Sequence, residues 1–175
     1  DESFALNPLS IYSKSKVNIE NYIQSKKNFY NFSPVILRFA TAFGLSPRMR
    51  FDLTVNEFSI DLLFKKTLEV YDAETWRPYF HTKDFANTIL QIMDIDKKLL
   101  KNEIFNVGSG KTISVNKIVS ILGGKKVFIP KRPGEPDSTF ADMKKIKKIL
   151  KWKPKISIEQ GIKIILAEIN YWKKA

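Results

Sequence analysis

The sequence predicts a mixed α/β fold. Short apolar runs, such as VILRFA (35–40) and LEVY (68–71), alternate with segments whose apolar residues recur at helical spacing. The hydrophobic content is 43% and the charged content 27%, and the 175 residues are enough to form a core. Strands that alternate with helices are typical of α/β proteins.

The first third of the chain begins with a helix. Ser10 can cap a helix that runs to about Asn28 and carries an apolar stripe of Ile11, Ile19, Tyr22 and Ile23. After the break at NFSP, VILRFA is expected as a strand and TAFGLSPRMRFD (41–52) as a loop. The next apolar residues at helical spacing predict a helix over 53–65, with inward positions at Leu53, Phe58, Leu62 and Leu63.

The rest of the chain continues the alternation. Strands are expected at LEVY, YFH (79–81), EIFNV (103–107) and KKVFIP (125–130). Helices are expected at 84–93 with Thr82 as the cap, at 114–122 ending at Gly123-Gly124, at 142–150 and at 157–173. VGSGKT (107–112) lacks the spacing of a phosphate-binding P-loop, so we expect a plain turn from strand to helix.

Composition narrows the class of protein. The chain has no cysteine, which is typical of a cytosolic protein and excludes a disulfide scaffold. With one histidine, a metal site would rest almost wholly on carboxylates, so no metal is expected. No apolar run is long enough to span a membrane, and no membrane partner is expected. The opening DESFALNP has neither a start methionine nor a leader, which suggests the middle of a gene product.

The net charge of +12 raises the question of nucleic-acid binding. Much of the charge lies in ADMKKIKKILKWKPK (141–155), where apolar residues at helical spacing (Met143, Ile146, Ile149 and Leu150) leave four lysines (Lys144, Lys145, Lys147 and Lys148) on the outer face. No stacking aromatics accompany these lysines. A solvated lysine face is therefore favoured over a nucleic-acid surface.

Tyr12 and Lys16 are four residues apart in the first helix, which places both side chains on one face. A free tyrosine has a pKa of about 10, and a nearby ammonium favours the phenolate. Such a pair can move a proton on or off a sugar hydroxyl. A buried tyrosine beside a solvated lysine is the structural alternative for the same pattern.

Five ordered blocks resemble the extended short-chain dehydrogenase/reductases, the nucleotide-sugar epimerase/dehydratase family. The first is PLSIYSKSK followed by Glu20, which is similar to the catalytic helix of that family. The others are LRFATAFG (37–44), RPYFHTKDFANTI (77–89), NEIFNVGSGKTISVNKIV (102–119) and RPGEPDSTFADMKKIKKILKWKP (132–154). The resemblance implies the C-terminal part of a Rossmann-like enzyme with its small α/β substrate-binding domain.

The resemblance also implies roles for single residues. Tyr12 would be the general acid/base, and Lys16 would hold the nicotinamide ribose and lower the pKa of Tyr12. Phe39 would lie at the cofactor, which would be NAD, with NADP as an alternative. The implied substrate is a nucleotide-diphosphate sugar, with its diphosphate at Arg77 and Arg132 and further contacts from Thr41, Arg48 and Asn56. Surface ion pairs are the alternative for the arginines.

The sequence departs from the family pattern at three places. Thr41 stands where an asparagine is frequent, and Pro78 replaces the usual aspartate. The segment SPRMRFDL (46–53) adds Arg48 and Arg50, which could recognise an anion or simply be exposed. His81 is interpreted as a structural strand residue. These departures leave the sugar and base open.

The Gly-rich dinucleotide turn does not occur in these residues. By the resemblance, that turn and a Ser/Thr that orients the substrate would precede Asp1. The expected division is 1–52, the end of the Rossmann-like domain, and 53–175, mainly substrate binding with segments that return to the Rossmann-like sheet. The leading hypothesis is the C-terminal portion of an NAD-dependent epimerase, inactive alone, cytoplasmic and homodimeric in full length. A dehydratase, an NADPH-dependent reductase, or a non-catalytic RNA- or protein-binding relative are the alternatives.

Overall fold

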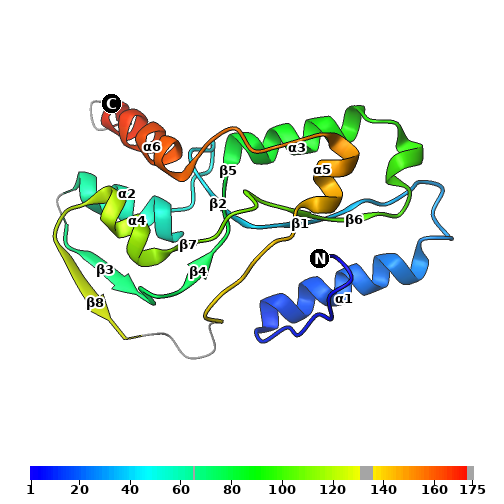
Figure 1. Cartoon of the computed structure of the whole chain (residues 1–175), viewed down its shortest axis with the longest axis horizontal. Helices are drawn as coiled ribbons and strands as arrows, with labels where there is room; N and C mark the ends of the chain where they lie inside the picture. Colours follow the sequence, from blue (N-terminus) through cyan, green and yellow to red (C-terminus); the bar gives the residue numbers. More distant parts are fainter. Residues whose placement is uncertain (65, 131–135, 173–175) are drawn as a thin grey trace.

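The computed structural model describes residues 1–64, 66–130 and 136–172, with side chains as far as residue 168. The helices are α1 (Ile11–Lys26), α2 (Thr54–Leu63), α3 (Thr82–Asp94), α4 (Val115–Leu122), α5 (Lys144–Leu150) and α6 (Ile158–Trp172), with a 3-10 turn η1 (Lys97–Leu100). The strands are β1 (Ile36–Phe39), β2 (Thr41–Phe43), β3 (Leu68–Tyr71), β4 (Trp76–Arg77), β5 (Tyr79–His81), β6 (Ile104–Val107), β7 (Ile113–Ser114) and β8 (Lys126–Ile129). The prediction of an α/β fold is confirmed (Figure 1).

The strands pair in four ladders. β1 pairs with β6, β2 with β5 and β3 with β8, all in parallel, whereas β4 and β7 are antiparallel. Each parallel pair joins strands that are far apart in the sequence, as the crossover connections of α/β proteins require. Figure 1 shows β1, β6, α3 and α5 on one side of the molecule and β3, β8, α2 and α4 on the other.

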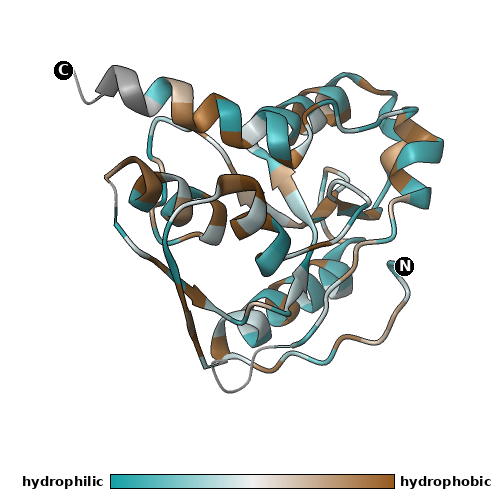
Figure 2. Cartoon of the chain, turned by 60° about the vertical axis from the view of Figure 1, so that its left-hand side comes forward, coloured by the Kyte–Doolittle hydropathy of each residue, from teal (hydrophilic) through white to brown (hydrophobic). Residues whose placement is uncertain are grey.

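Each side has its own apolar core. One core gathers buried residues of α2, α4, α6 and their strands, including Phe58, Val70 and Ile165. The other includes Phe105, Ile146 and further residues of β6, α5 and the segment that follows it. The helices are banded in hydrophobic and hydrophilic colours in Figure 2, as expected for helices that bury one face. The domain boundary at residue 52 stays a prediction.

β5 lies between the two cores. Tyr79 and His81 both pack against Phe43, with ring centroids 6.4 and 5.2 Å away, whereas Phe80 belongs to the other core, where it contacts Trp152. Alternate side chains of a strand point to opposite faces, so this short strand supplies both cores at once. β5 therefore connects the two halves of the molecule.

Buried polar groups cap α3 and hold it against the segment that precedes α6. His81 precedes α3, and its Nδ1 accepts a hydrogen bond from the Lys83 amide at 3.2 Å, so His81 rather than Thr82 caps the helix. Asp84 is 1% exposed, and its carboxylate accepts from the backbone amides of Lys155 and Ile156. The predicted structural role of His81 agrees with this position, although His81 acts as a cap as well as a strand residue.

Two expectations of secondary structure and one of side-chain exposure were wrong. The loop expected at 41–52 begins with the strand β2, because residues 41–43 pair with β5. β4 and β7 were also missed, since each has only two residues and is formed by its partner. Lys145 does not lie freely on the outer face of α5: its ammonium is 2.6 Å from a Glu103 carboxylate oxygen and donates to the Ile104 carbonyl oxygen at 2.8 Å.

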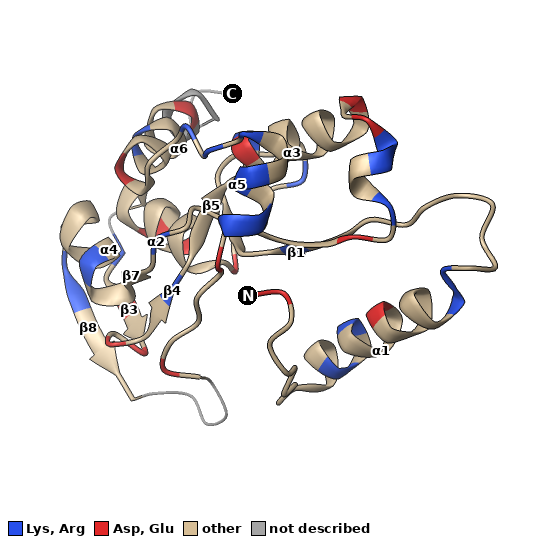
Figure 3. Cartoon of the chain, turned by 45° about the vertical axis from the view of Figure 1, so that its right-hand side comes forward, with Lys and Arg blue, Asp and Glu red and all other residues tan. Residues whose placement is uncertain are grey.

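The basic residues are spread over several elements. Figure 3 shows Lys and Arg on α1, on α5 and in the segment after α3. Among the helices that the structure describes, none has the length and apolar character that a membrane crossing requires.

Candidate active site

α1 carries the Tyr-Lys pair. Ser10 and Ser13 form a capping box, in which each side chain accepts from the backbone amide of the other, at 3.1 and 3.0 Å. This box starts the helix at Ile11, so Tyr12 lies in its first turn. The Lys16 ammonium lies 5.3 Å from the centroid of the Tyr12 ring, and the Tyr12 side chain is 71% exposed. The pair is thus accessible to a ligand, contrary to the alternative of a buried tyrosine.

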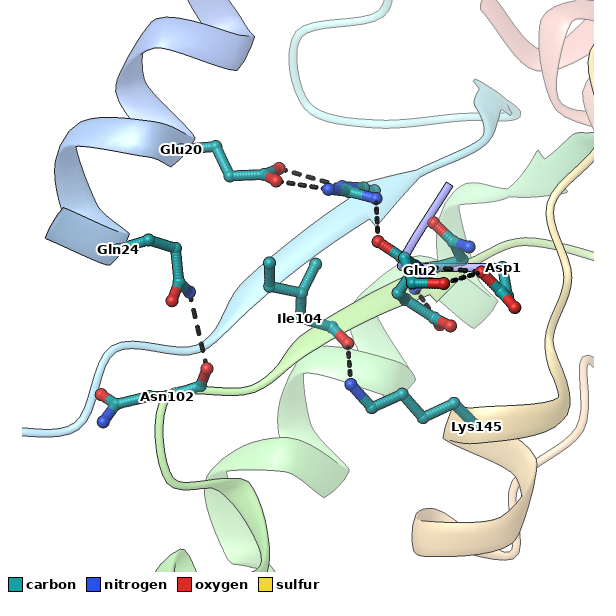
Figure 4. Close-up of polar contacts among 10 residues, drawn as sticks. Asp1, Glu2, Glu20, Gln24, Asn102, Ile104 and Lys145 are labelled. Carbon is teal, nitrogen blue, oxygen red and sulfur yellow. Dashed lines mark hydrogen bonds and ion pairs between the residues drawn. The ribbon is translucent and has the colours of Figure 1, made fainter. Parts of the chain in front are cut away.

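A few polar contacts join α1 to the rest of the molecule. Glu20 binds the Arg38 guanidinium of β1 through both carboxylate oxygens, and Figure 4 shows Glu20 pointing from the helix toward this strand. Gln24 Nε2 donates to the Asn102 carbonyl oxygen at 3.5 Å. The pKa of Arg38 is raised, first by the hydrogen bond with Glu20 and then by its charge, while partial burial opposes the shift. No side chain of α1 is buried.

The loop between β2 and α2 is shaped by Asn56. This residue is 2% exposed, and its Oδ1 accepts from the Gly44 amide at 2.9 Å while its Nδ2 donates to the Arg50 carbonyl oxygen at 2.8 Å. Gly44 has a φ of 115°, and a Cβ there would lie 2.8 Å from His81 Nε2, so a glycine is required. Buried Met49 anchors the same loop in the core.

Arg50 of this loop pairs with Asp52. Its Nε and one terminal nitrogen bind the two carboxylate oxygens of Asp52 at 3.1 and 2.6 Å. The pKa of Arg50 is raised by this hydrogen bond and by the charge of Asp52. Arg48 is exposed. Of the two arginines that the sequence analysis considered, Arg50 therefore already has a carboxylate partner.

Arg77 and Tyr79 line a cavity of about 380 Å³ beside this loop. Asp52, Thr54, Glu69 and other residues complete its walls. Arg77 Nη1 donates to the Pro136 carbonyl oxygen at 2.9 Å and to the Trp76 carbonyl oxygen at 3.2 Å. Burial raises the pKa of Tyr79, and a hydrogen bond with Thr54 opposes that shift. The lining contains one arginine and several hydroxyl and carboxylate groups. Because the carboxylates repel an anion, this cavity can hold a polar anionic ligand only where Arg77 neutralises the charge of that ligand.

The remaining predicted residues lie on β1, on β2 or outside the described part. Phe39 is half-buried and stacks on Phe85 with ring centroids 3.6 Å apart. Thr41 begins β2, and its backbone amide donates to the Pro78 carbonyl oxygen at 3.1 Å. Arg132 lies outside the described residues. The described side chains form no group of three acidic, imidazole or thiol ligands that could hold a metal ion.

The sequence analysis missed Thr54, Tyr79 and Asp52 as residues of the cavity. Tyr79 had a signal, because alternate residues of a strand share a face and Arg77 and Tyr79 are two apart. No signal in the sequence pointed to Thr54 and Asp52, because only the fold of the loop that Asn56 holds places them at the cavity.

The sequence is similar to those of known proteins. A family model described as GDP-mannose 4,6 dehydratase matches residues 1–165. A UDP-glucuronate 4-epimerase from Thermodesulfobacterium geofontis is 31% identical over 89% of this chain and 49% of its own length. The chain spans about half the length of the curated relatives it matches.

Solved structures agree with this match. The UDP-glucuronic acid 4-epimerase of Bacillus cereus, in complex with UDP-glucuronic acid and NAD, superposes with a TM-score of 0.89 at 26% identity, over 98% of this chain and 56% of that one. The UDP-glucose 4-epimerase of Thermotoga maritima with UDP-glucose gives a TM-score of 0.86 at 26% identity, over 95% of this chain and 55% of that one. The chain belongs to the extended short-chain dehydrogenase/reductase family of nucleotide-sugar epimerases and dehydratases.

Proposed function

We propose that this chain is the catalytic-helix and substrate-binding part of an NAD-dependent nucleotide-sugar epimerase. The observation that carries the proposal is the exposed Tyr12 phenol with the Lys16 ammonium 5.3 Å from its ring. The relatives named as UDP-sugar 4-epimerases, one of them bound to NAD, support this reaction.

In this proposal Tyr12 moves a proton at the sugar. Its phenolate accepts the proton of the hydroxyl whose carbon is oxidised, and it returns the proton when that carbon is reduced. Lys16 supplies the positive charge beside the phenolate and donates hydrogen bonds to the ribose of the cofactor. The exposed phenol and ammonium fit this part of the cofactor, and Phe39 is proposed to lie beside it. Tyr12, Lys16 and Phe39 would hold the nicotinamide end of NAD, which would supply a hydride acceptor and donor at the sugar carbon.

The other predicted residues are proposed to hold the substrate. Arg77 in the 380 Å³ cavity, together with Arg132, binds the diphosphate, because a guanidinium fork suits paired phosphate oxygens. Thr41 and Arg48 contact the sugar or its charged groups. Asn56 acts indirectly, since its amide already binds the backbone at Gly44 and Arg50.

The test uses the enzyme at the length in which the cell makes it, with NAD and a panel of UDP- and GDP-sugars. Tyr12→Phe is expected to lower kcat by about 100-fold or more while substrate affinity, measured separately by calorimetry, is retained. Tyr22→Phe, an exposed tyrosine of the same helix, is the matched control. Unchanged turnover in Tyr12→Phe would contradict the proposal.

A second test concerns the 175 residues alone. We expect them to be inactive, because they contain no Gly-rich dinucleotide turn. Tight binding of NAD together with turnover of a nucleotide sugar by these residues alone would contradict the assignment.

A dehydratase is the second candidate, because the matching family model is described as one. The two reactions are separated by their products: an epimer has the mass of the substrate, whereas a dehydratase product is lighter by one water. Use of NADPH with net reduction would identify a reductase.

We also propose a homodimer in the cytoplasm. Support for the dimer comes from α1, whose apolar residues Ile11, Ile19 and Tyr22 are 88%, 54% and 62% exposed. Light scattering measures the mass, and a monomer at all concentrations would contradict this part.

A further inference from the structure

A second and larger cavity, of about 870 Å³, lies at the opposite end of α1 from Tyr12. It is formed by two connecting segments, 27–35 and 92–102, which lead from α1 into β1 and from α3 through η1 into β6 (Figure 1). α1 has 16 residues, so it is about 24 Å long at 1.5 Å per residue. Since Tyr12 lies in the first turn and Lys27 caps the other end, the proposed catalytic pair does not reach this cavity.

Aromatic rings form part of its wall. Tyr30 and Phe32 stack with centroids 4.9 Å apart and planes inclined by 20°, and Phe32 remains 61% exposed. Apolar residues of the cavity, Val35, Ile92 and Leu100, lie at or near the second core. An exposed aromatic ring above an apolar floor is a surface on which a flat ring can stack.

The charge of the cavity has one sign. Lys27, Lys97 and Lys101 line it, no aspartate or glutamate does, and none of the three has an ion-pair partner among the described residues. Three ammonium groups around one cavity raise the local concentration of anions. The proposed substrate cavity differs, because carboxylates outnumber Arg77 in its charged lining.

Side-chain amides are the third type of group in the lining of this cavity, after the aromatic rings and the lysines. Asn28, Asn31 and Asn102 line the cavity, and each amide can donate and accept. The side-chain oxygen of Asn102 is buried and has no hydrogen-bond partner among the described residues. The Asn102 backbone oxygen accepts from Gln24, which ties this wall to the last turns of α1 (Figure 4).

We propose that this cavity is a second ligand site, separate from the proposed active site, and that it binds a free nucleoside monophosphate. The base stacks on Phe32, the amides meet its polar edge and the lysines bind its phosphate. A fatty acid would use the lysines and the apolar floor but would leave the aromatic face and the three amides without a role. The proposal does not depend on the epimerase reaction.

The test is a titration of the ¹⁵N-labelled chain with GMP or UMP, followed by NMR. Saturable shifts are expected for amides of 27–33 and 97–102. Lys101→Glu should weaken binding about fivefold or more, whereas Lys98→Glu, the same change at an exposed lysine of η1 outside the lining, should not. Phe32→Ala should likewise weaken binding about fivefold or more, with Phe29→Ala in the same segment as the control.

Three results would overturn the proposal. The first is the absence of shifts in these segments at millimolar nucleotide. The second is equal binding of inorganic phosphate, which would show that only an anion is recognised. The third is a strong, salt-dependent preference for single-stranded RNA over GMP. Arg77→Ala separates the two sites, because it should abolish binding at the proposed substrate cavity and leave the shifts in 27–33 and 97–102 unchanged.

Discussion

Two regions differ in how they are attached to the rest of the molecule: α1, which carries Tyr12 and Lys16, and the region around His81. α1 has no buried side chain and is joined mainly through the Glu20–Arg38 ion pair. At the junction of β5, α3 and α6, by contrast, His81 and Asp84 are each 1% exposed and packed between the cores. Substitutions at the junction should therefore change the free energy of unfolding, whereas those in α1 should change local order and chemistry.

The largest effect is expected for Asp84→Asn. The buried carboxylate accepts from the backbone amides of Lys155 and Ile156, and an asparagine would lose the charge and part of the acceptor capacity. We expect the free energy of unfolding to fall by about 2–4 kcal/mol, measured by urea denaturation. Asp94→Asn, at the exposed end of the same helix, should change it by about 0.5 kcal/mol or less. Equal effects of the two variants would contradict the comparison.

Gly161→Ala should come next, because α6 lies close to Phe43 of β2 and His81 of β5 at this position. A Cβ at this position would lie 2.4 Å from Phe43 Cε2 and 2.7 Å from His81 Cδ2, and both atoms belong to packed rings. We expect a loss of about 1–2 kcal/mol after the gain in helix propensity is subtracted, again from urea denaturation. Lys163→Ala, an exposed position on α6, is the control; a stabilised Gly161→Ala protein would show that the contact relaxes freely.

The third prediction concerns pH and His81. Burial lowers the pKa of His81, and Lys83 adds to this effect, while Asp84 opposes it. In the unfolded state this histidine has a pKa of about 6.5, so as the pH drops it is protonated in the unfolded state before the folded state. The free energy of unfolding therefore falls as the pH drops below about 6.5. The slope is expected to reach at most about 1.4 kcal/mol per pH unit, and above pH 7 this histidine should contribute no pH dependence.

Denaturation between pH 5 and 8 measures this slope, and His81→Gln should reduce it. Since His81 is the chain's single histidine, the difference between the two proteins in this range isolates one group. Identical slopes would mean that another group titrates.

The smallest change in global stability is expected for Glu20→Gln. The variant loses the ionic contact with Arg38, which should lower the free energy of unfolding by about 1 kcal/mol. The effect should be local: in this variant the amide hydrogens of α1 should exchange faster than those of the rest of the molecule. Glu168→Gln on α6 is exposed and serves as the control. If exchange in α1 stays as slow as in α3, the helix is held by contacts other than this pair.

Much of the secondary structure could be predicted because it rests on local signals. The Ser10 cap, the stop at Gly123 and the apolar runs of β1 and β3 were predicted to within a few residues. β2, β4 and β7 could not be predicted, because such short strands exist only where a distant partner supplies hydrogen bonds. The cap of α3 was assigned to Thr82 because the sequence does not show that His81 is turned back to the Lys83 amide.

The sequence by itself determined the spacing of Tyr12 and Lys16, the capping box that starts their helix and the order of the family motifs. These features depend on residues a few positions apart. Only the tertiary structure decided that Asn56 holds the loop after β2 through two hydrogen bonds to the backbone, and that three lysines and two stacked aromatic side chains line one cavity at the far end of α1. Each of these depends on how segments distant in sequence pack together, and a one-dimensional pattern does not contain that information.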